Sequence, residues 1–390
     1  MAYSTRLSDI RPFQVMGLLE QAQALESAGH DIIHLEIGEP DFPCPEPVVA
    51  AGRRALDRGE TRYTPATGIA LLKEAIAGHY ASAFGVEVDP RRVIITPGAS
   101  GALLLAAMLL AEQDSRILMA DPTYPCNRHF MALMGARIDP VSVGPDSSWQ
   151  LDDGLVAQHW REDTRVAMLA TPSNPTGHVL GCDALARIAH AVRERSGYLL
   201  VDEIYQGLTY DIEPVTTLSV ASDAFVVNSF SKYFGMTGWR LGWLVAPDDA
   251  IEPLSRLAQN VFLAAPTLAQ YAALAAFSPE SLDEFERRRH ELKLRRDTLL
   301  AGLKPLGLAP EVVPEGAFYL WLDVSCYTND SKAFCQRLLE EEGVAITPGS
   351  DFALQNGNRY VRIAFTTNQA RLEEAIARLS RFLARQESVL

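Results

Sequence analysis

Short apolar runs alternate with helix-like stretches through the middle of the chain, between about residues 90 and 250. Several of these runs are apolar at every position rather than at every second position, which is typical of strands buried on both faces. The pattern predicts seven strands, at residues 93–96, 117–120, 141–143, 166–170, 198–201, 224–228 and 241–246. Helical spacing between some of them, as in residues 182–195, predicts an α/β domain with a mostly parallel seven-stranded sheet flanked by helices.

The pattern changes beyond residue 280. A charged amphipathic stretch at residues 281–303 predicts a long helix. It is followed by an apolar segment at 317–322, a helix at 332–342, a strand-like segment at 360–365 and a closing helix at 369–385. This order of elements is an α+β pattern, and it predicts a second, smaller domain.

Length and charge narrow the class of protein. A chain of 390 residues is too long for one small core, so two domains are expected. The net charge of −14 argues against nucleic acid and anionic membranes as partners. The longest apolar run, residues 101–111, is too short to cross a bilayer and predicts a buried helix. Five dispersed cysteines without a C-x-x-C pair predict reduced thiols in a cytoplasmic protein, rather than disulfides or a zinc site.

Polar residues gather where the predicted strands end. Ligands of open α/β sheets bind beyond the carboxyl ends of the strands, so these segments are where a site is expected. Five strand ends are followed by PGAS (97–100), DPTYP (121–125), TPSNPTG (171–177), DEIY (202–205) and SFSK (229–232). In that order they deliver an anion-binding turn, an aromatic ring, an amide, a carboxylate with a phenol, and a lysine.

Some of these residues suit a phosphate group. Small residues at the start of a helix expose backbone N–H groups to an anion, although Gly-Ala-Ser before a helix is, taken alone, most often a plain N-cap. Ser229 and Ser231 can add hydroxyl donors, and Arg240 can add a fork of charged donors. Their joint occurrence along one edge of the sheet favours the phosphate interpretation.

The other residues suit an aromatic ring that carries an aldehyde. Tyr124 can stack on such a ring, and Asp202 can keep a pyridine nitrogen protonated. Asn174 and Tyr205 can hydrogen-bond a phenolate oxygen on the ring. Lys232 can form a Schiff base with the aldehyde and then move a proton. Together these residues predict a phosphorylated pyridine aldehyde as the ligand.

At this point nearly the whole chain resembles the class I and II aminotransferases, enzymes of pyridoxal 5′-phosphate (PLP) fold type I that include aspartate aminotransferase. The resemblance rests on IGEPDF (37–42), YTPATG (63–68), TPGAS (96–100), DPTYP (121–125), SNPTG (173–177), VDEIY (201–205), SFSKYFGMTGWRLGW (229–243) and RYVRIAF (359–365). It implies a transaminase that uses PLP to move the amino group of an α-amino acid to a 2-oxo acid, in two half-reactions of ping-pong order.

The resemblance also implies roles for the matching residues. Lys232, Asp202 and Tyr205 would be catalytic. The residues that it places around the cofactor are Lys232, Asp202, Tyr205, Asn174, Tyr124, Ala99, Ser100, Ser229, Arg240 and Tyr63. Arg362 would clamp the α-carboxylate of the substrate, with Gly38 and Asn174 beside it; a structural salt bridge is the alternative for Arg362.

By the same resemblance, residues 46–284 form a large PLP-binding domain, and residues 1–45 and 285–390 together form the small domain. Tyr63 would reach the phosphate in the neighbouring subunit, so a homodimer with shared active sites is expected. Packing within its own chain is the alternative for Tyr63. No metal is expected.

Two other functions remain open. A PLP-dependent C–S lyase is the runner-up, because α,β-elimination begins from the same carbanion as transamination. A non-catalytic PLP-binding regulator fused to a DNA-binding module is a more distant third, and the acidic charge argues against it.

The sequence indicates the amino-donor substrate less clearly than it indicates the cofactor. A distal carboxylate on the substrate needs a cation, but the predicted helix at 99–111 has none and the stretch 12–19 is apolar or neutral. Arg128 is a candidate cation, with a surface ion pair as its alternative. We therefore expect neutral or hydrophobic amino donors, with 2-oxoglutarate or pyruvate as the acceptor.

Overall fold

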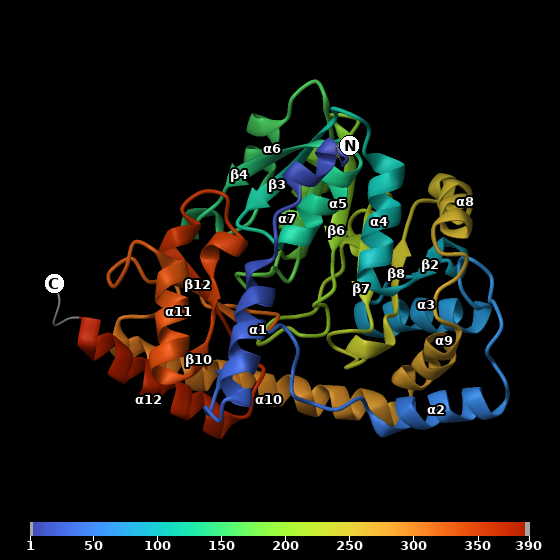
Figure 1. Ribbon diagram of the computed structural model, residues 1–390. Coiled ribbons are helices and arrows are strands. Elements are labelled where there is room, and N and C mark those ends of the chain that lie inside the picture. Colours follow the sequence, from blue (N-terminus) through green and yellow to red (C-terminus); the bar gives the residue numbers. More distant parts are fainter. Residues whose placement is uncertain (1–2, 387–390) are drawn as a thin grey trace.

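A seven-stranded sheet forms the centre of the larger part of the molecule in the computed structural model, which describes residues 3–386 (Figure 1). The strand order is β2-β8-β7-β6-β5-β3-β4, and all pairings are parallel except those of β8 with its two neighbours. The strands are β2 (Val93–Thr96), β3 (Arg116–Asp121), β4 (Arg137–Ser142), β5 (Thr164–Ala170), β6 (Tyr198–Asp202), β7 (Phe225–Ser229) and β8 (Gly242–Val245). The predicted fold class and the seven predicted strands are confirmed.

Strand β4 begins four residues before the segment predicted at 141–143. It lies at the edge of the sheet and pairs only with β3. Most of its residues are exposed or half-buried, and they include Arg137, Asp139 and Pro140. An edge strand tolerates charged residues and proline because one side of it is open, so no apolar run marks its start.

Helices cover the sheet on both faces and surround the smaller part of the molecule. They are α1 (Gln14–Ser27), α2 (Glu46–Asp57), α3 (Ala70–Phe84), α4 (Gly98–Leu110), α5 (Pro125–Leu133), α6 (Asp153–His159), α7 (Cys182–Arg193), α8 (Ile251–Val261), α9 (Thr267–Ala273), α10 (Pro279–Leu303), α11 (Ser331–Glu342) and α12 (Gln369–Gln386). Along β2, Ile94 packs in the layer of α4 and α8, whereas Val93 and Ile95 pack in the layer of α3 and α7. Burial on both faces explains why these strands are apolar at consecutive positions.

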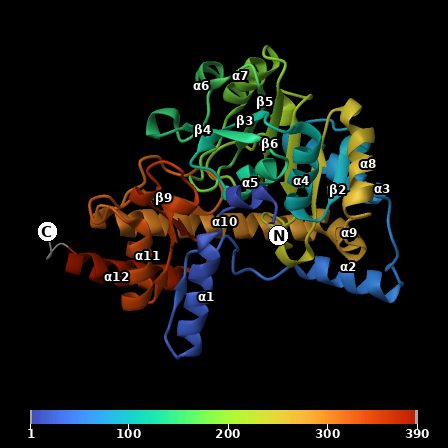
Figure 2. The ribbon, with the colours of Figure 1, turned by 45° about the horizontal axis from the view of Figure 1, so that its top comes forward.

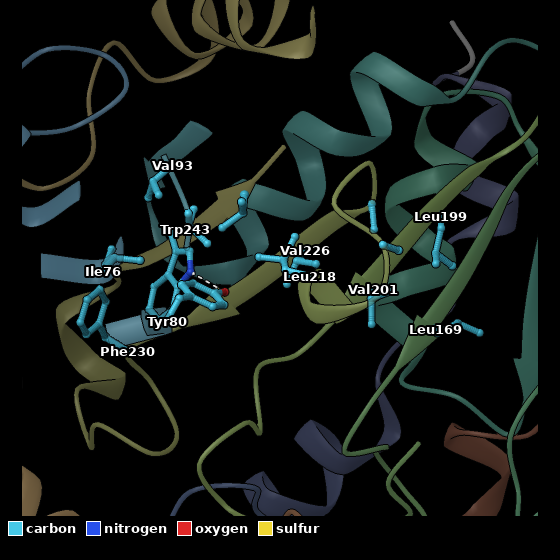
Figure 3. Close-up of a cluster of buried hydrophobic side chains, with 14 of the residues drawn as sticks. Ile76, Tyr80, Val93, Leu169, Leu199, Val201, Leu218, Val226, Phe230 and Trp243 are labelled. Carbon is cyan, nitrogen blue, oxygen red and sulfur yellow. Dashed lines mark hydrogen bonds between the residues drawn. The ribbon is translucent and has the colours of Figure 1, made fainter. Parts of the chain in front are cut away.

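The layer of α3 and α7 contains a hydrogen bond inside a cluster of aromatic side chains. Trp243 and Tyr80 are fully buried, and the Trp243 Nε1–H donates to the Tyr80 hydroxyl at 3.2 Å (Figure 3). Phe230 packs against the Trp243 ring with 4.9 Å between ring centroids. A buried indole needs such an acceptor, because an unpaired N–H in the core is costly.

The smaller part of the molecule holds two short sheets. A three-stranded antiparallel sheet has the order β11-β12-β9, and β1 pairs with β10 in parallel. The strands are β1 (Ile33–His34), β9 (Tyr319–Asp323), β10 (Val344–Ala345), β11 (Thr347–Pro348) and β12 (Tyr360–Ala364). Strands β9 and β12 and helices α11 and α12 confirm the elements predicted after residue 316, whereas the two-residue strands are too short for the hydrophobic pattern to show.

Helix α10 connects the two parts without a break. Phe285, near its start, is buried in the core of the large sheet, whereas Leu292 and Leu299 are buried in the core of the smaller part. Figures 1 and 2 show the helix running from the region of α2 and α9 to the region of α12. The expected domain boundary at 284/285 falls inside this helix, and the division into domains stays a prediction. No helix within residues 3–386 is long and apolar enough to cross a membrane.

Replacing Tyr80 by phenylalanine tests the polar contact in the core. The ring remains, but the Trp243 Nε1–H loses its acceptor, so we expect the free energy of unfolding to fall by about 1–3 kcal/mol. Urea unfolding of the cofactor-free protein measures the change. The control is Tyr198→Phe, whose side chain is 42% exposed and whose effect should stay within ~0.5 kcal/mol. Equal losses in the two variants would show that the Tyr80 hydroxyl does not stabilise the core.

Candidate active site

A cavity of ≈ 280 Å³ lies at the carboxyl ends of the parallel strands, and most of the predicted site residues line it. The residues concerned are Gly38, Ala99, Ser100, Tyr124, Asn174, Asp202, Tyr205, Ser229, Lys232, Arg240 and Arg362. The exception is Tyr63, whose side chain is 83% exposed and therefore does not pack within its own chain. The fold thus brings together residues from segments that are up to 324 positions apart, between Gly38 and Arg362.

One end of the cavity is an anion cradle at the start of α4. Gly98 has a φ of +70°, and a Cβ added there would lie 2.6 Å from Arg240 Nη2. A Cβ at Gly242 would lie 2.6 Å from the backbone nitrogen of Ala99, so the start of α4 is held directly against β8. Backbone N–H groups at a helix start, with a guanidinium above them, are the donors that a phosphate prefers.

Ser229 stands at the end of β7 beside this cradle. Its buried hydroxyl donates to the Leu241 carbonyl at 3.2 Å and accepts the Ser231 N–H at 3.0 Å. These bonds tie the turn that carries Lys232 to the segment that leads into β8. Ser229 therefore both lines the cavity and stabilises the turn beside the cradle.

Asp202 lies at the end of β6 and is only 4% exposed. Its carboxylate accepts hydrogen bonds from Asn127 Nδ2 at 3.3 Å and from the Ile204 N–H at 3.1 Å, and no cation among the described residues forms an ion pair with it. Burial raises the pKa of Asp202 to about 6. A buried carboxylate without a counter-cation suits a ligand that brings a positive charge, such as a protonated ring nitrogen.

Lys232 reaches the cavity from the turn after β7. Its Nζ donates to the Gly38 carbonyl at 2.7 Å, which fixes the direction of the side chain. Burial lowers the pKa of Lys232 to about 8, and the cations of Arg362 and Arg240 act in the same direction. A lysine with a pKa near 8 is partly neutral at physiological pH, so it can act as a nucleophile and as a base.

Arg362, in β12, is 3% exposed, and no carboxylate among the described residues forms an ion pair with it. Its Nη1 donates to Asn174 Oδ1 at 3.0 Å and its Nη2 to the Glu36 carbonyl at 2.6 Å, while its Nε has no acceptor. The guanidinium lies between two aromatic rings, with its carbon 4.2 Å from the centroid of Tyr319 and 4.6 Å from that of Phe352. The alternative of a structural salt bridge is therefore wrong, and a buried guanidinium without an anion suits the carboxylate of a ligand.

The wall opposite these polar groups is apolar. It is formed by the start of α1 and by side chains of α4 and α5, namely Phe13, Val15, Met16, Leu19, Leu103 and Phe130. The Tyr124 ring meets Phe13 edge-on, with 6.0 Å between ring centroids. Four residues of the N-terminal stretch 12–19, which the sequence shows to be apolar or neutral, thus line the cavity.

Arg128 lies outside this cavity, and neither interpretation of it from the sequence is correct. Its guanidinium is buried and donates to the carbonyls of Asp351 and Phe352, at 3.0 and 3.2 Å. The Asp351 carboxylate in turn accepts the N–H groups of Gln14 and Val15, both at 2.9 Å. Arg128 therefore braces the turn that fixes the start of α1, because α5 directs it under this turn rather than to solvent or to the substrate.

Sequence reasoning missed several polar residues in and around the site, among them Asn127 and Tyr319. Asn127 holds the Asp202 carboxylate, and its position three residues after Tyr124, in the same helical turn, could have identified it. Tyr319 lines the cavity, and its hydroxyl lies 2.8 Å from that of Tyr205. It begins an apolar strand, so the sequence around it resembles an ordinary core segment.

The comparison with known families agrees with this geometry. The family model described as aminotransferase class I and II matches residues 30–379. The chain belongs to the class I and II aminotransferases. Enzymes of this family depend on PLP, so PLP is the cofactor of this aminotransferase and transfer of amino groups is its reaction. The lyase and regulator alternatives are not favoured, because the relatives that match it carry aminotransferase names.

Individual relatives cover almost the whole chain. The valine–pyruvate aminotransferase of Mycobacterium tuberculosis is 38% identical over 379 residues, covering 97% of each chain. The aspartate aminotransferase of Thermotoga maritima is 35% identical over 383 residues, covering 97% of this chain and 99% of that one. A crystal structure of an aminotransferase from Mycobacterium tuberculosis matches with a TM-score of 0.95 at 37% identity, covering 99% of this chain and 100% of that one.

The residues around the cavity fit PLP. The cradle that a Cβ at Gly98 would fill suits the phosphate, and the unpaired carboxylate of Asp202 suits the ring nitrogen. Tyr124 would cover one face of the ring, and Lys232 would reach the aldehyde carbon. The phosphate, the ring nitrogen and the aldehyde of the cofactor would each have a complementary partner among these residues.

Adding a methyl group at Gly98 should weaken PLP binding. In Gly98→Ala the new Cβ displaces the Arg240 guanidinium and strains a φ of +70°, so at least one charged hydrogen bond to the phosphate is lost. We expect the Kd for PLP to rise by about tenfold to a hundredfold, measured by titrating the cofactor-free enzyme with PLP. The control is Gly78→Ala in α3, where a Cβ would meet nothing within 4 Å. An unchanged Kd in Gly98→Ala would show that the cradle does not hold the phosphate.

Proposed function

We propose that this aminotransferase takes neutral or hydrophobic amino acids as donors and uses 2-oxoglutarate or pyruvate as the acceptor. The observation that supports this is the lining of the cavity. Among the described residues that line it, the lysines and arginines are Lys232, Arg240 and Arg362. In this proposal all three are engaged by the cofactor or by the α-carboxylate. A distal carboxylate would then be desolvated against an apolar wall, at a high cost in free energy.

The names of the relatives include both kinds of donor. One of them is named for valine and pyruvate, and another for aspartate. The apolar side chains of Phe13, Val15, Met16 and Leu19 on the cavity wall favour the first kind.

The cradle and the ring contacts hold the cofactor in this proposal. The backbone of Ala99, the hydroxyls of Ser100 and Ser229 and the guanidinium of Arg240 bind the phosphate. Asp202 keeps a proton on the ring nitrogen. Bound PLP supplies an electron sink that stabilises negative charge at the substrate Cα.

Three groups orient the substrate against that ring and move its proton. Arg362 holds the α-carboxylate, assisted by Asn174 and by the backbone at Gly38. Tyr124 stacks on the ring. The Lys232 Nζ accepts the proton from the substrate Cα and passes it to the carbon of the cofactor to which the amino nitrogen is bound. Its pKa of about 8 allows both transfers near neutral pH.

Tyr63 is the basis for proposing a homodimer with shared active sites. Its side chain is 83% exposed and does not line the cavity of its own subunit, so its hydroxyl is accessible to a neighbouring molecule. We place the enzyme in the cytoplasm, which its five free cysteines support. Residues 46–284 form the large domain in this proposal, and residues 1–45 and 285–390 the small one.

A cation placed at the rim of the cavity should change the choice of donor. The wild-type enzyme should have a higher kcat/KM for valine, leucine, methionine or phenylalanine than for aspartate. Met16 lines the cavity and is 51% exposed, so Met16→Arg should raise the kcat/KM ratio of aspartate to valine by about fivefold. The control is Leu56→Arg, which adds the same charge at a side chain that is 57% exposed and outside the cavity. The proposal fails if aspartate is by far the best donor of the wild-type enzyme.

Hybrid dimers test the shared active site. Lys232→Ala and Tyr63→Ala should each have little activity alone. Refolding them together at equal amounts should restore about one quarter of the wild-type activity, because half of the dimers are hybrids and each hybrid has one intact site. Analytical ultracentrifugation of the same mixture reports the oligomeric state. Absence of recovery in a mixture that contains dimers would show that Tyr63 acts within its own subunit or not at all.

A further inference from the structure

We propose that Tyr319 is a positioning residue that controls two working groups of the site. Its ring holds the Arg362 guanidinium in one plane, and its hydroxyl directs the proton of Tyr205 into the cavity. The inference rests on the proposed function, in which Arg362 binds the α-carboxylate, and on the role expected of Tyr205 from the sequence, as a donor to the ring oxygen of the cofactor. It assigns a role to a residue that touches both groups.

Tyr319 lines the cavity from the small antiparallel sheet. It is the first residue of β9, is 1% exposed and pairs with Ala364 of β12. A Cβ added at Gly38 would lie 2.1 Å from its hydroxyl oxygen, so the glycine leaves the space that the tyrosine fills. The carbonyl of that same Gly38 accepts the Lys232 Nζ at 2.7 Å. Tyr319 is therefore in contact with Gly38 as well as with Arg362 and Tyr205.

The hydroxyl of Tyr319 is placed to act as a donor to Tyr205. The two phenolic oxygens are 2.8 Å apart, and both side chains are buried. Burial raises the pKa of both phenols, and it raises that of Tyr205 well above its usual value. The Arg362 guanidinium lies over the Tyr319 ring, 4.2 Å from its centroid, and this cation opposes the rise at Tyr319. The more acidic phenol donates, so the Tyr205 oxygen accepts and the proton of Tyr205 stays free for the cavity.

The ring of Tyr319 is one half of a clamp on Arg362. Phe352 forms the other half, 4.6 Å from the guanidinium carbon. Stacking between two rings fixes the plane of a guanidinium, whose Nη1 and Nη2 are also held by Asn174 and by the Glu36 carbonyl. The arginine is thus held in one orientation before a carboxylate arrives, which lowers the entropy cost of binding.

Three variants separate the two roles. Tyr319→Phe removes the hydroxyl and keeps the ring. Phe352→Leu removes the other ring of the clamp and leaves the two phenols untouched. Tyr319→Leu removes both contributions. If Tyr319 only fills the core, the variants should differ in stability alone. If it has the two proposed roles, Tyr319→Phe should change the titration of the cofactor band, and Phe352→Leu should change the KM for the amino donor.

The first readout is the pH at which the visible band of the PLP-loaded enzyme titrates. A donor on the ring oxygen draws negative charge from it and weakens its hold on the proton of the lysine nitrogen beside it. In Tyr319→Phe that donor is weaker, so the midpoint should rise by about half a pH unit to one unit. In Phe352→Leu it should stay within ~0.2 unit of the wild-type value. An unmoved midpoint in Tyr319→Phe would overturn the role of the hydroxyl.

The second readout is the KM for the amino donor, compared with kcat. Phe352→Leu and Tyr319→Leu should raise KM by about threefold to tenfold, the range of a buried cation–π contact. Tyr319→Phe should keep KM within about twofold of the wild-type value, because its ring remains. A wild-type KM in both leucine variants would overturn the role of the ring.

Failure of this inference can be told apart from failure of the proposed function. If the wild-type enzyme shows no visible band with added PLP, or if Lys232→Ala keeps the wild-type band, the proposed site itself is wrong. If the wild-type band is present, depends on Lys232 and titrates identically in Tyr319→Phe, only the role of the Tyr319 hydroxyl is wrong.

Discussion

The buried guanidinium of Arg362 is the constraint on which the rest of the site depends. A desolvated charge costs several kcal/mol unless its donors are satisfied, and no carboxylate among the described residues satisfies this one. Its donors go instead to the Glu36 carbonyl, just before IGEPDF, and to Asn174, in the loop after β5. The arginine therefore ties the N-terminal segment, the small antiparallel sheet and the large sheet together around one cavity.

Two other buried ionisable groups of the cavity are also without a full set of partners. Asp202 is a buried carboxylate with no ion-pair partner within residues 3–386, and Lys232 has a pKa that burial lowers to about 8. Burial destabilises the charged form of each group, and in the proposed function each gains a partner from the cofactor or the substrate. Burying these groups lowers the stability of the fold but holds them in position for the reaction. This arrangement is usual in enzymes that stabilise charge during a reaction. In the proposed function, the apolar wall near α1 selects which substrate side chains fit.

The sequence predicts the large sheet well because its strands are buried on both faces, and it predicts the cavity because functional residues follow the strand ends. Its failures have local physical causes. The start of β4 carries charges because it is an edge strand, and β1, β10 and β11 have two residues each. Arg128 and Tyr319 depend on tertiary contacts, with the turn at 351–352 and with Tyr205, that no spacing in the sequence reveals. In the proposed homodimer, the place where Tyr63 acts depends on a second copy of the chain, which no pattern within one sequence reveals.

The central claim is that a PLP-loaded enzyme uses Arg362 to select α-amino acids. The most direct test follows the visible band of the purified enzyme during addition of L-valine, or of 2-methylpropylamine, which has the same side chain without the carboxylate. Without any oxo acid present, L-valine should convert the band to that of the amino form of the cofactor, and the amine should leave it largely unchanged at the same concentration. Equal conversion by both compounds in the wild-type enzyme would contradict the account of Arg362, and absence of the band with added PLP would contradict the account of the whole site.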